Sequence, residues 1–123
     1  MIVFQLHELL ADPTEVPEPL RFHGLAYSAN VASTATTKAT AALIRLPAGS
    51  RGHWHRHADG QVVHVVQGAG LVGRRGEDPL QVTTGDIVWI EPDEEHWHGS
   101  AAGSDLAQLA YSFGAITWLE PSL

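Results

Sequence analysis

Residues that favour tight turns recur at short intervals along the whole chain and leave no room between them for long helices. Gly, Pro and Asp adopt or pre-set the backbone angles that turns require. The turn signals are Asp12-Pro13, Pro17-Glu18-Pro19, Pro47-Ala48-Gly49, Asp59-Gly60, Gly68-Ala69-Gly70, Gly76-Glu77-Asp78-Pro79, Thr84-Gly85-Asp86 and Glu91-Pro92-Asp93. This punctuation predicts an all-β sandwich or barrel.

The segments between the turns are short and rich in β-branched and apolar residues. We expect strands at Ala41–Leu46, Gln61–Gln67, Leu71–Arg74, Leu80–Val82, Ile87–Ile90 and Leu106–Phe113. Phe4–Leu10 and Ile116–Leu119 are the best candidates for helices. The Ala-, Ser- and Thr-rich stretch Ser28–Thr40 fits either a loop or a pair of strands.

Composition limits the classes of protein to which the chain can belong. A length of 123 residues with 44% apolar content suits a single domain, residues 1–123, with one packed core. A net charge of -7 argues against binding to nucleic acid or to anionic membranes. Without cysteine there is no disulfide, thiolate zinc site or thiol nucleophile. The first ten residues do not read as a signal peptide, and no apolar run approaches membrane-spanning length, so we expect a cytoplasmic protein.

Histidine is unusually frequent, with eight residues against seven Lys plus Arg. His53, His55 and His57 alternate with other residues, so on a strand their side chains share one face. The segment His96-Trp97-His98 repeats the alternation. Two strands that both present imidazole inward can converge on one first-row divalent metal ion.

The spacing of these residues resembles the cupin superfamily. Its first motif, G-x5-H-x-H-x(3,4)-E-x6-G, is matched from Gly49 through His55 and His57 to Gly68, with Gln61 in the glutamate position. Its second motif, G-x5-P-x-G-x2-H, is matched at Gly85 and His96. It departs where Glu91 stands for proline and Asp93 for glycine. Pro47–Gln61, Gly85–Gly99 and Ile116–Glu120, together with Phe22-His23-Gly24, are similar to small bacterial cupins that include manganese-dependent hydroxynitrile lyases.

This resemblance implies a jelly-roll barrel, the double-stranded β-helix, whose barrel part covers about residues 40–114. It also implies one bound divalent metal ion, with Mn or Fe favoured over Zn, Ni, Co or Cu. The ligands that it implies are His55, His57, Gln61 and His96. A small organic substrate would occupy the rest of the barrel interior.

Gln61 has a chemical consequence for this implied site. Three imidazoles and one amide carry no charge, so the ion keeps its full positive charge and acts mainly as a Lewis acid. This favours a lyase, isomerase or decarboxylase, hydroxynitrile cleavage included. A metal-dependent dioxygenase and a non-catalytic cupin that binds a small ligand are the alternatives, because one fold hosts all of these functions.

Several further residues are candidates for catalytic or structural roles. His98 shares a strand face with His96 and is the first candidate for a general base. His53 fits a rim position or a catalytic one, and Arg45 fits a pocket cation or a solvated strand end. Trp54 and Trp97 should point away from the metal, into packing or a homodimer interface, whereas Trp89 is expected in the core. The bystander histidines should be His7, His23 and His64.

Overall fold

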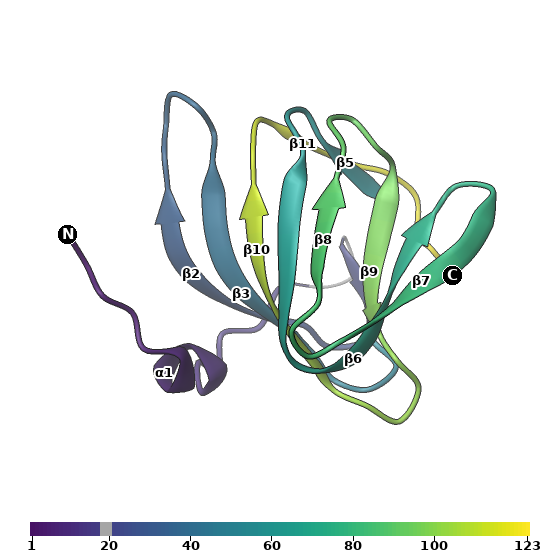
Figure 1. Ribbon diagram of the computed structural model, residues 1–123, viewed down its shortest axis with the longest axis horizontal. Helices are drawn as coiled ribbons and strands as arrows, with labels where there is room; N and C mark the ends of the chain where they lie inside the picture. The colour runs from purple at the N-terminus through teal and green to yellow at the C-terminus, as the bar shows by residue number, and fades with distance from the viewer. Residues whose placement is uncertain (18–20) are drawn as a thin grey trace.

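The computed structural model describes residues 1–17 and 21–123 of the chain as a curled β-sheet structure with one short helix (Figure 1). The elements are α1 Leu6–Leu10, β1 Phe22–His23, β2 Tyr27–Ser33, β3 Thr40–Leu46, β4 Arg51–Gly52, β5 His55–His57, β6 Gln61–Arg74, β7 Glu77–Thr83, β8 Ile87–Ile90, β9 His96–Ser100, β10 Leu106–Ser112 and β11 Ile116–Trp118. The all-β prediction is confirmed, and the turn expected at Pro17-Glu18-Pro19 falls mostly outside the described residues.

The sheet follows the order β1-β4-β9-β6-β10-β3-β2, and its neighbouring strands run antiparallel. Strand β6 joins the two halves of the barrel. Its first part pairs with β10 and β8, and its second part pairs with β9 and β7. In Figure 1, β6 bends below the other strands and continues toward the β6–β7 hairpin.

The bend in β6 occurs where the sequence indicated a turn. Gly68 has a φ of +86°, and a Cβ there would overlap the Asp105 carbonyl group. Glycine therefore lets one strand change layers without interruption. The two predicted strands Gln61–Gln67 and Leu71–Arg74 are in fact one strand of 14 residues.

Two further expectations need correction. Ile116–Trp118 is strand β11, which pairs with β5, and not part of a helix. Trp89 lies on the outer face of β8 with 51% of its surface exposed, because the inward positions of that strand belong to Val88 and Ile90. Within Ser28–Thr40, the strand-pair alternative is closer, since β2 and β3 form an antiparallel hairpin.

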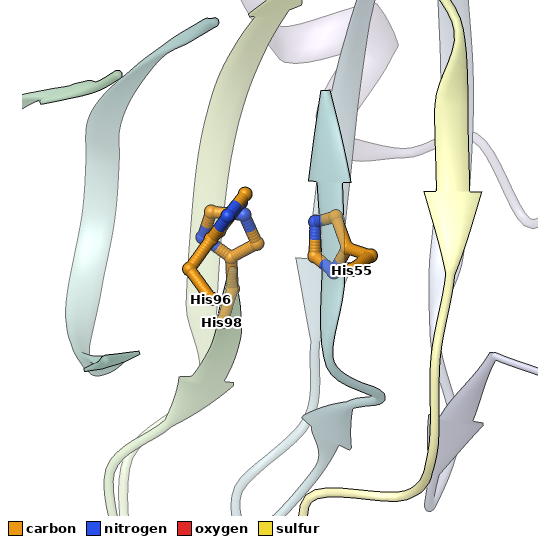
Figure 2. Close-up of side chains that lie close together, drawn as sticks. All are labelled: His55, His96 and His98. Carbon is orange, nitrogen blue, oxygen red and sulfur yellow. The ribbon is translucent and has the colours of Figure 1, made fainter. Parts of the chain in front are cut away.

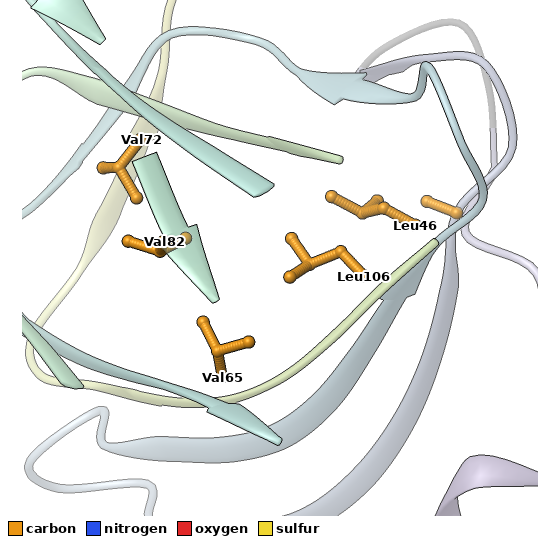
Figure 3. Packing of buried hydrophobic residues seen from close by; sticks show 6 residues of the cluster. Leu46, Val65, Val72, Val82 and Leu106 are labelled. Carbon is orange, nitrogen blue, oxygen red and sulfur yellow. The ribbon is translucent and has the colours of Figure 1, made fainter. Parts of the chain in front are cut away.

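The apolar core fills one end of the barrel. The central residues come from five segments of the chain and pack together at no more than 8% exposure (Figure 3): Ala26, Leu46, Val65, Val72, Val82 and Leu106. Strand alternation accounts for Val65, because Val63 and Val65 on β6 are buried while Val62 and His64 before and between them are only half-buried. The interior therefore divides into this packed end and a polar region that contains the histidines.

Trp97 on β9 packs closely against Gly73 on the neighbouring strand β6. A Cβ at Gly73 on β6 would overlap the indole ring of Trp97, which is only 4% exposed. The Arg51 guanidinium lies 3.8 Å from the centroid of the same ring. Trp97 is thus covered within its own chain. Trp54 is covered in the same way by Arg75, at 3.8 Å.

Candidate metal centre

Three histidines from two neighbouring strands form a compact group (Figure 2). His55 on β5 is opposite His96 on β9, and His98 follows on β9 two residues later. One ring nitrogen from each lies within 4.8 Å of the others, and all three residues are buried. The centroids of the His55 and His96 rings are 4.2 Å apart.

Backbone carbonyls orient two of these rings. Nδ1 of His55 lies 2.9 Å from the His53 carbonyl oxygen, and Nδ1 of His96 lies 2.8 Å from the Glu94 carbonyl oxygen. A neutral imidazole with its proton on Nδ1 has its lone pair on Nε2. The hydrogen bonds therefore aim two Nε2 lone pairs at the centre, as is typical of histidines that bind metals.

Gln61, at the start of β6, completes the group. Its side-chain oxygen Oε1 lies 3.0 Å from Nε2 of His96 and 3.0 Å from Nε2 of His98. Its Nε2 donates a hydrogen bond to Ser112 Oγ on β10, at 2.8 Å. The amide nitrogen is thus engaged on the side away from the histidines, and the oxygen faces them.

Burial keeps these imidazoles uncharged. It lowers the pKa of His96, and it holds the pKa values of His55 and His98 well below the usual range, with neighbouring histidines adding to the effect. Burial also lowers the pKa of His57 to about 4. All four rings are neutral at pH 7, which is the protonation state that binds metal.

These contacts fit a metal ion. With its proton on Nδ1, Nε2 of His96 cannot donate to Gln61 Oε1, so two lone-pair-bearing atoms face each other at 3.0 Å. A cation bound by both would resolve this unfavourable contact. Two ligand atoms about 2.1 Å from one ion and at right angles to each other are separated by about 3.0 Å.

His57 lies next to the three-histidine group. Its ring centroid is 5.2 Å from that of His55 and 5.7 Å from that of His96. Both of its ring nitrogens are buried without a hydrogen-bond partner in the described structure, and Nδ1 of His98 is also unpartnered. Such orphaned atoms destabilise a protein unless a ligand meets them. The implied ligation by His57 stays a prediction, and the geometry adds His98 to the candidate ligands.

A cavity of about 250 Å³ opens beside these residues. His55, His57, Gln61 and His98 contribute to its lining, with apolar walls from residues such as Phe22, Ile44 and Trp118. The described residues that line it include no Asp or Glu. The site therefore combines uncharged metal donors with room for a small organic molecule.

Two residues proposed from the sequence lie elsewhere. The Arg45 guanidinium is 4.5 Å from the centroid of the Tyr27 ring, donates to the Asp12 carbonyl oxygen and lines a different cavity. This placement gives no support for a role as a pocket cation. His53 is buried but does not line the cavity, and it contributes through its backbone carbonyl rather than its ring.

Sequence reasoning missed several residues of the site. Ser112 and Gln108 face the cavity from alternate positions of β10, and Gln108 Oε1 is buried without a partner. Alternation shows that the two share a strand face, but not which face is internal. The sequence predicts Trp118 in a helix, whereas it lies on β11 with its ring centroid 4.6 Å from that of His55.

The second cupin motif accepts Asp93 in the position where glycine is expected. Asp93, in the expected glycine position, has a φ of +60°, a conformation that Asp adopts more readily than most residues. Its backbone N–H donates to the His57 carbonyl oxygen at 2.8 Å. The turn before His96 thus keeps its shape and links the two histidine segments.

Comparison with known proteins assigns the family. The cupin domain family model matches residues 42–111, which is more than half of the chain and includes both histidine segments. The chain belongs to the cupin family. In this cupin, the match begins in β3 and ends in β10. It therefore includes Gln61 and all the candidate histidine ligands, and it stops one residue before Ser112.

Individual relatives differ in activity. Over 76 residues, the cupin is 37% identical to (R)-mandelonitrile lyase of Granulicella tundricola; the match covers 58% of this chain and 58% of that protein. A cupin-like protein of Thermotoga maritima has 28% identity and a TM-score of 0.78, over 84% of this chain and 82% of its own. An acetylacetone dioxygenase from Acinetobacter johnsonii shares the fold, with 17% identity and a TM-score of 0.73 over 89% and 74%.

No helix in residues 1–17 and 21–123 combines the length and the apolar character needed to cross a bilayer.

Proposed function

We propose that this cupin is a divalent-metal-dependent enzyme of Lewis-acid type that acts on a small molecule with a hydroxyl or carbonyl group. The main support for the proposal is that the candidate metal ligands, imidazoles and one amide, carry no charge. Gln61 occupies the position where the cupin motif has a carboxylate, and Ser112 holds its oxygen toward the histidines. A dication bound there would retain its charge and polarise a substrate oxygen.

Lyase chemistry is the first candidate reaction, supported by the 37% identity to a mandelonitrile lyase. In hydroxynitrile cleavage, a base takes the hydroxyl proton and the bond to the nitrile carbon breaks. The bonding electrons leave with cyanide, a carbonyl group forms, and cyanide takes up the proton to leave as HCN. His98 is the proposed base rather than a ligand: with its proton on Nε2, directed at Gln61 Oε1 3.0 Å away, its Nδ1 keeps a lone pair. The residue lines the cavity, and this Nδ1 has no partner in the described structure.

Other chain residues would bind and shield the substrate. Phe22 and Trp118 pack edge to face, with ring centroids 6.1 Å apart, and both line the cavity. Their rings would hold the apolar part of the substrate and exclude water from the reacting bond. The buried oxygen of Gln108 would accept a hydrogen bond from the substrate.

The test is turnover of mandelonitrile by protein loaded separately with Mn(II), Fe(II) or Zn(II), with cyanide and benzaldehyde measured in air and without oxygen. We expect equal rates in both atmospheres. His98→Ala should lower kcat roughly 10²-fold or more, whereas His64→Ala, on the outer face of β6, should not. The metal content of the His98 variant separates loss of a base from loss of a ligand.

Two outcomes would contradict the proposal. Substrate-dependent oxygen consumption, with no product formed in the absence of oxygen, would identify a dioxygenase. Saturable ligand binding without turnover across nitriles, hydroxy acids and ketones would identify a binding protein.

A further inference from the structure

The cupin's seven basic side chains have different environments. Three form ion pairs with carboxylates at the surface: Arg56, Arg74 and Arg75. Two more, Arg45 and Arg51, lie over aromatic rings and donate to backbone carbonyl oxygens. These five make ion pairs or side-chain hydrogen bonds within the described part of the chain, and the remaining two basic residues are Arg21 and Lys38.

Arg21 and Lys38 both line the cavity that contains the histidines. Both are exposed, so they lie where the cavity meets solvent. Within residues 1–17 and 21–123, neither forms an ion pair with a carboxylate. Arg21 lies 5.4 Å from the centroid of the Trp118 ring, which is itself part of the cavity wall.

Lys38 also holds an unusual backbone conformation. Its φ is +53°, in the left-handed region, in the turn between β2 and β3. Gly or Asn adopts this conformation with less strain than Lys does. The turn by itself therefore does not account for a lysine at this position, and strained residues concentrate at functional sites.

The charges around the cavity favour an anionic ligand. The chain carries a net charge of -7, yet the described residues lining this cavity include no carboxylate. Apolar walls with one sign of charge at the opening focus the field and attract a ligand of opposite charge. An anion at the opening would meet Arg21 and Lys38, and none of the described lining residues carries a negative charge.

We infer that the cavity selects small substrates that carry a carboxylate, which the positive charges of Arg21 and Lys38 attract to the opening while the other end of the substrate reaches the histidines. This inference deepens the proposed function by naming the class of substrate. It concerns the entrance of the site rather than its metal, so the two can be tested separately.

The test uses two rigid ligands that differ mainly in charge, 4-formylbenzoate and 4-formylbenzamide. Because the ring holds the carboxylate opposite the aldehyde, the carboxylate cannot reach the histidines while the aldehyde occupies them. Binding is measured by calorimetry, with and without Mn(II). We expect the acid to bind roughly five- to tenfold more tightly than the amide at low salt, and this preference to shrink as ionic strength rises.

Variants assign the preference to the two side chains. Arg21→Gln and Lys38→Asn should each weaken binding of the acid roughly threefold and leave the amide unchanged. Lys38→Asn should also preserve or raise the melting temperature, which separates a binding role from a structural one. Lys38→Arg should retain the preference, and Arg74→Gln, at the β6–β7 hairpin, serves as the matched control.

Equal affinity for acid and amide, no binding of the acid at millimolar concentration, or equal weakening of both ligands in the variants would overturn the inference. A preference that persists in protein without metal, combined with no turnover after metal loading, would refute the proposed function and leave this inference standing. Metal-dependent turnover of neutral substrates, without any preference for the acid, would support the proposed function and refute this inference.

Discussion

Gln61 Nε2 donates a hydrogen bond to Ser112 Oγ at 2.8 Å, and this contact decides which end of the amide faces the histidines. Without it, the amide could rotate and present N–H groups, which repel a cation. Ser112→Ala should therefore weaken metal binding roughly 10- to 100-fold, as loss of an orienting contact does at other metal sites. Competition with a fluorescent chelator measures the change. Ser28→Ala, which removes another cavity-lining hydroxyl, should leave the affinity unchanged.

Gln61→Glu should bind a divalent metal at least as tightly as the wild type, since a carboxylate adds a negative charge to an otherwise neutral donor set. The same charge stabilises the oxidised metal and should lower its reduction potential. The Ser112 hydroxyl can reverse its role and donate to the new carboxylate. Chelator competition and voltammetry check both effects. An unchanged affinity together with an unchanged potential would show that residue 61 is not a ligand.

The double variant His55→Ala/His96→Ala should lose nearly all bound metal, because it removes the two imidazoles whose Nδ1 atoms are held by backbone carbonyls. Elemental analysis of the purified protein gives the metal content. A matched double variant, His7→Ala/His64→Ala, changes histidines outside the cavity and should keep the wild-type content. Wild-type metal content in the first variant would place the site elsewhere.

The buried histidines should make the metal-free protein sensitive to acid. The pKa of His57 is about 4 in the folded protein, mainly because of burial, against 6.5 for an ordinary histidine. Between these values the unfolded chain binds a proton that the folded chain does not, so the free energy of unfolding falls as pH decreases from 6.5 to 4. His57 alone should contribute a loss of about 2–3 kcal/mol by pH 4 and no pH dependence above 6.5.

Urea denaturation at pH 7.5, 5.5 and 4.5 measures this dependence. His57→Gln should make the profile less steep, because one of the four buried imidazoles is removed, whereas His64→Gln, on the outer face of β6, should not. The opposite result, a free energy of unfolding that stays constant from pH 7.5 to 4.5, would mean that His57 titrates normally.

Gly73→Ala should destabilise the fold, because its Cβ would overlap the buried indole of Trp97. Overpacking of this kind costs about 1–3 kcal/mol. Thermal denaturation gives the size of the effect. Gly76→Asn provides the control, since a Cβ there meets no atom within 4 Å and Asn tolerates a φ of +72°. Equal melting temperatures for the Gly73 variant and the wild type would show that Trp97 can move aside.

The sequence predicted the β class and most strand positions, because turn residues and period-two alternation are local signals. It failed where a local signal has two structural meanings. Gly68-Ala69-Gly70 is typical of a turn but allows a bend within β6, and the predicted helix Ile116–Leu119 is instead strand β11, which pairs with β5. Trp89 read as core because alternation does not tell which face of a strand lies inside.

The sequence by itself determined the chemical nature of the site: imidazoles at period two in two segments, an amide where a carboxylate is usual, and no cysteine. Only the tertiary structure decided which groups meet. Ser112 approaches Gln61 across 51 residues of chain, and His98 reaches the same amide oxygen across 37. Arg21 and Lys38 line the same cavity, whereas Arg45 lines a different one. Strand register and sheet curvature set these encounters, and both arise from long-range packing that no local pattern encodes.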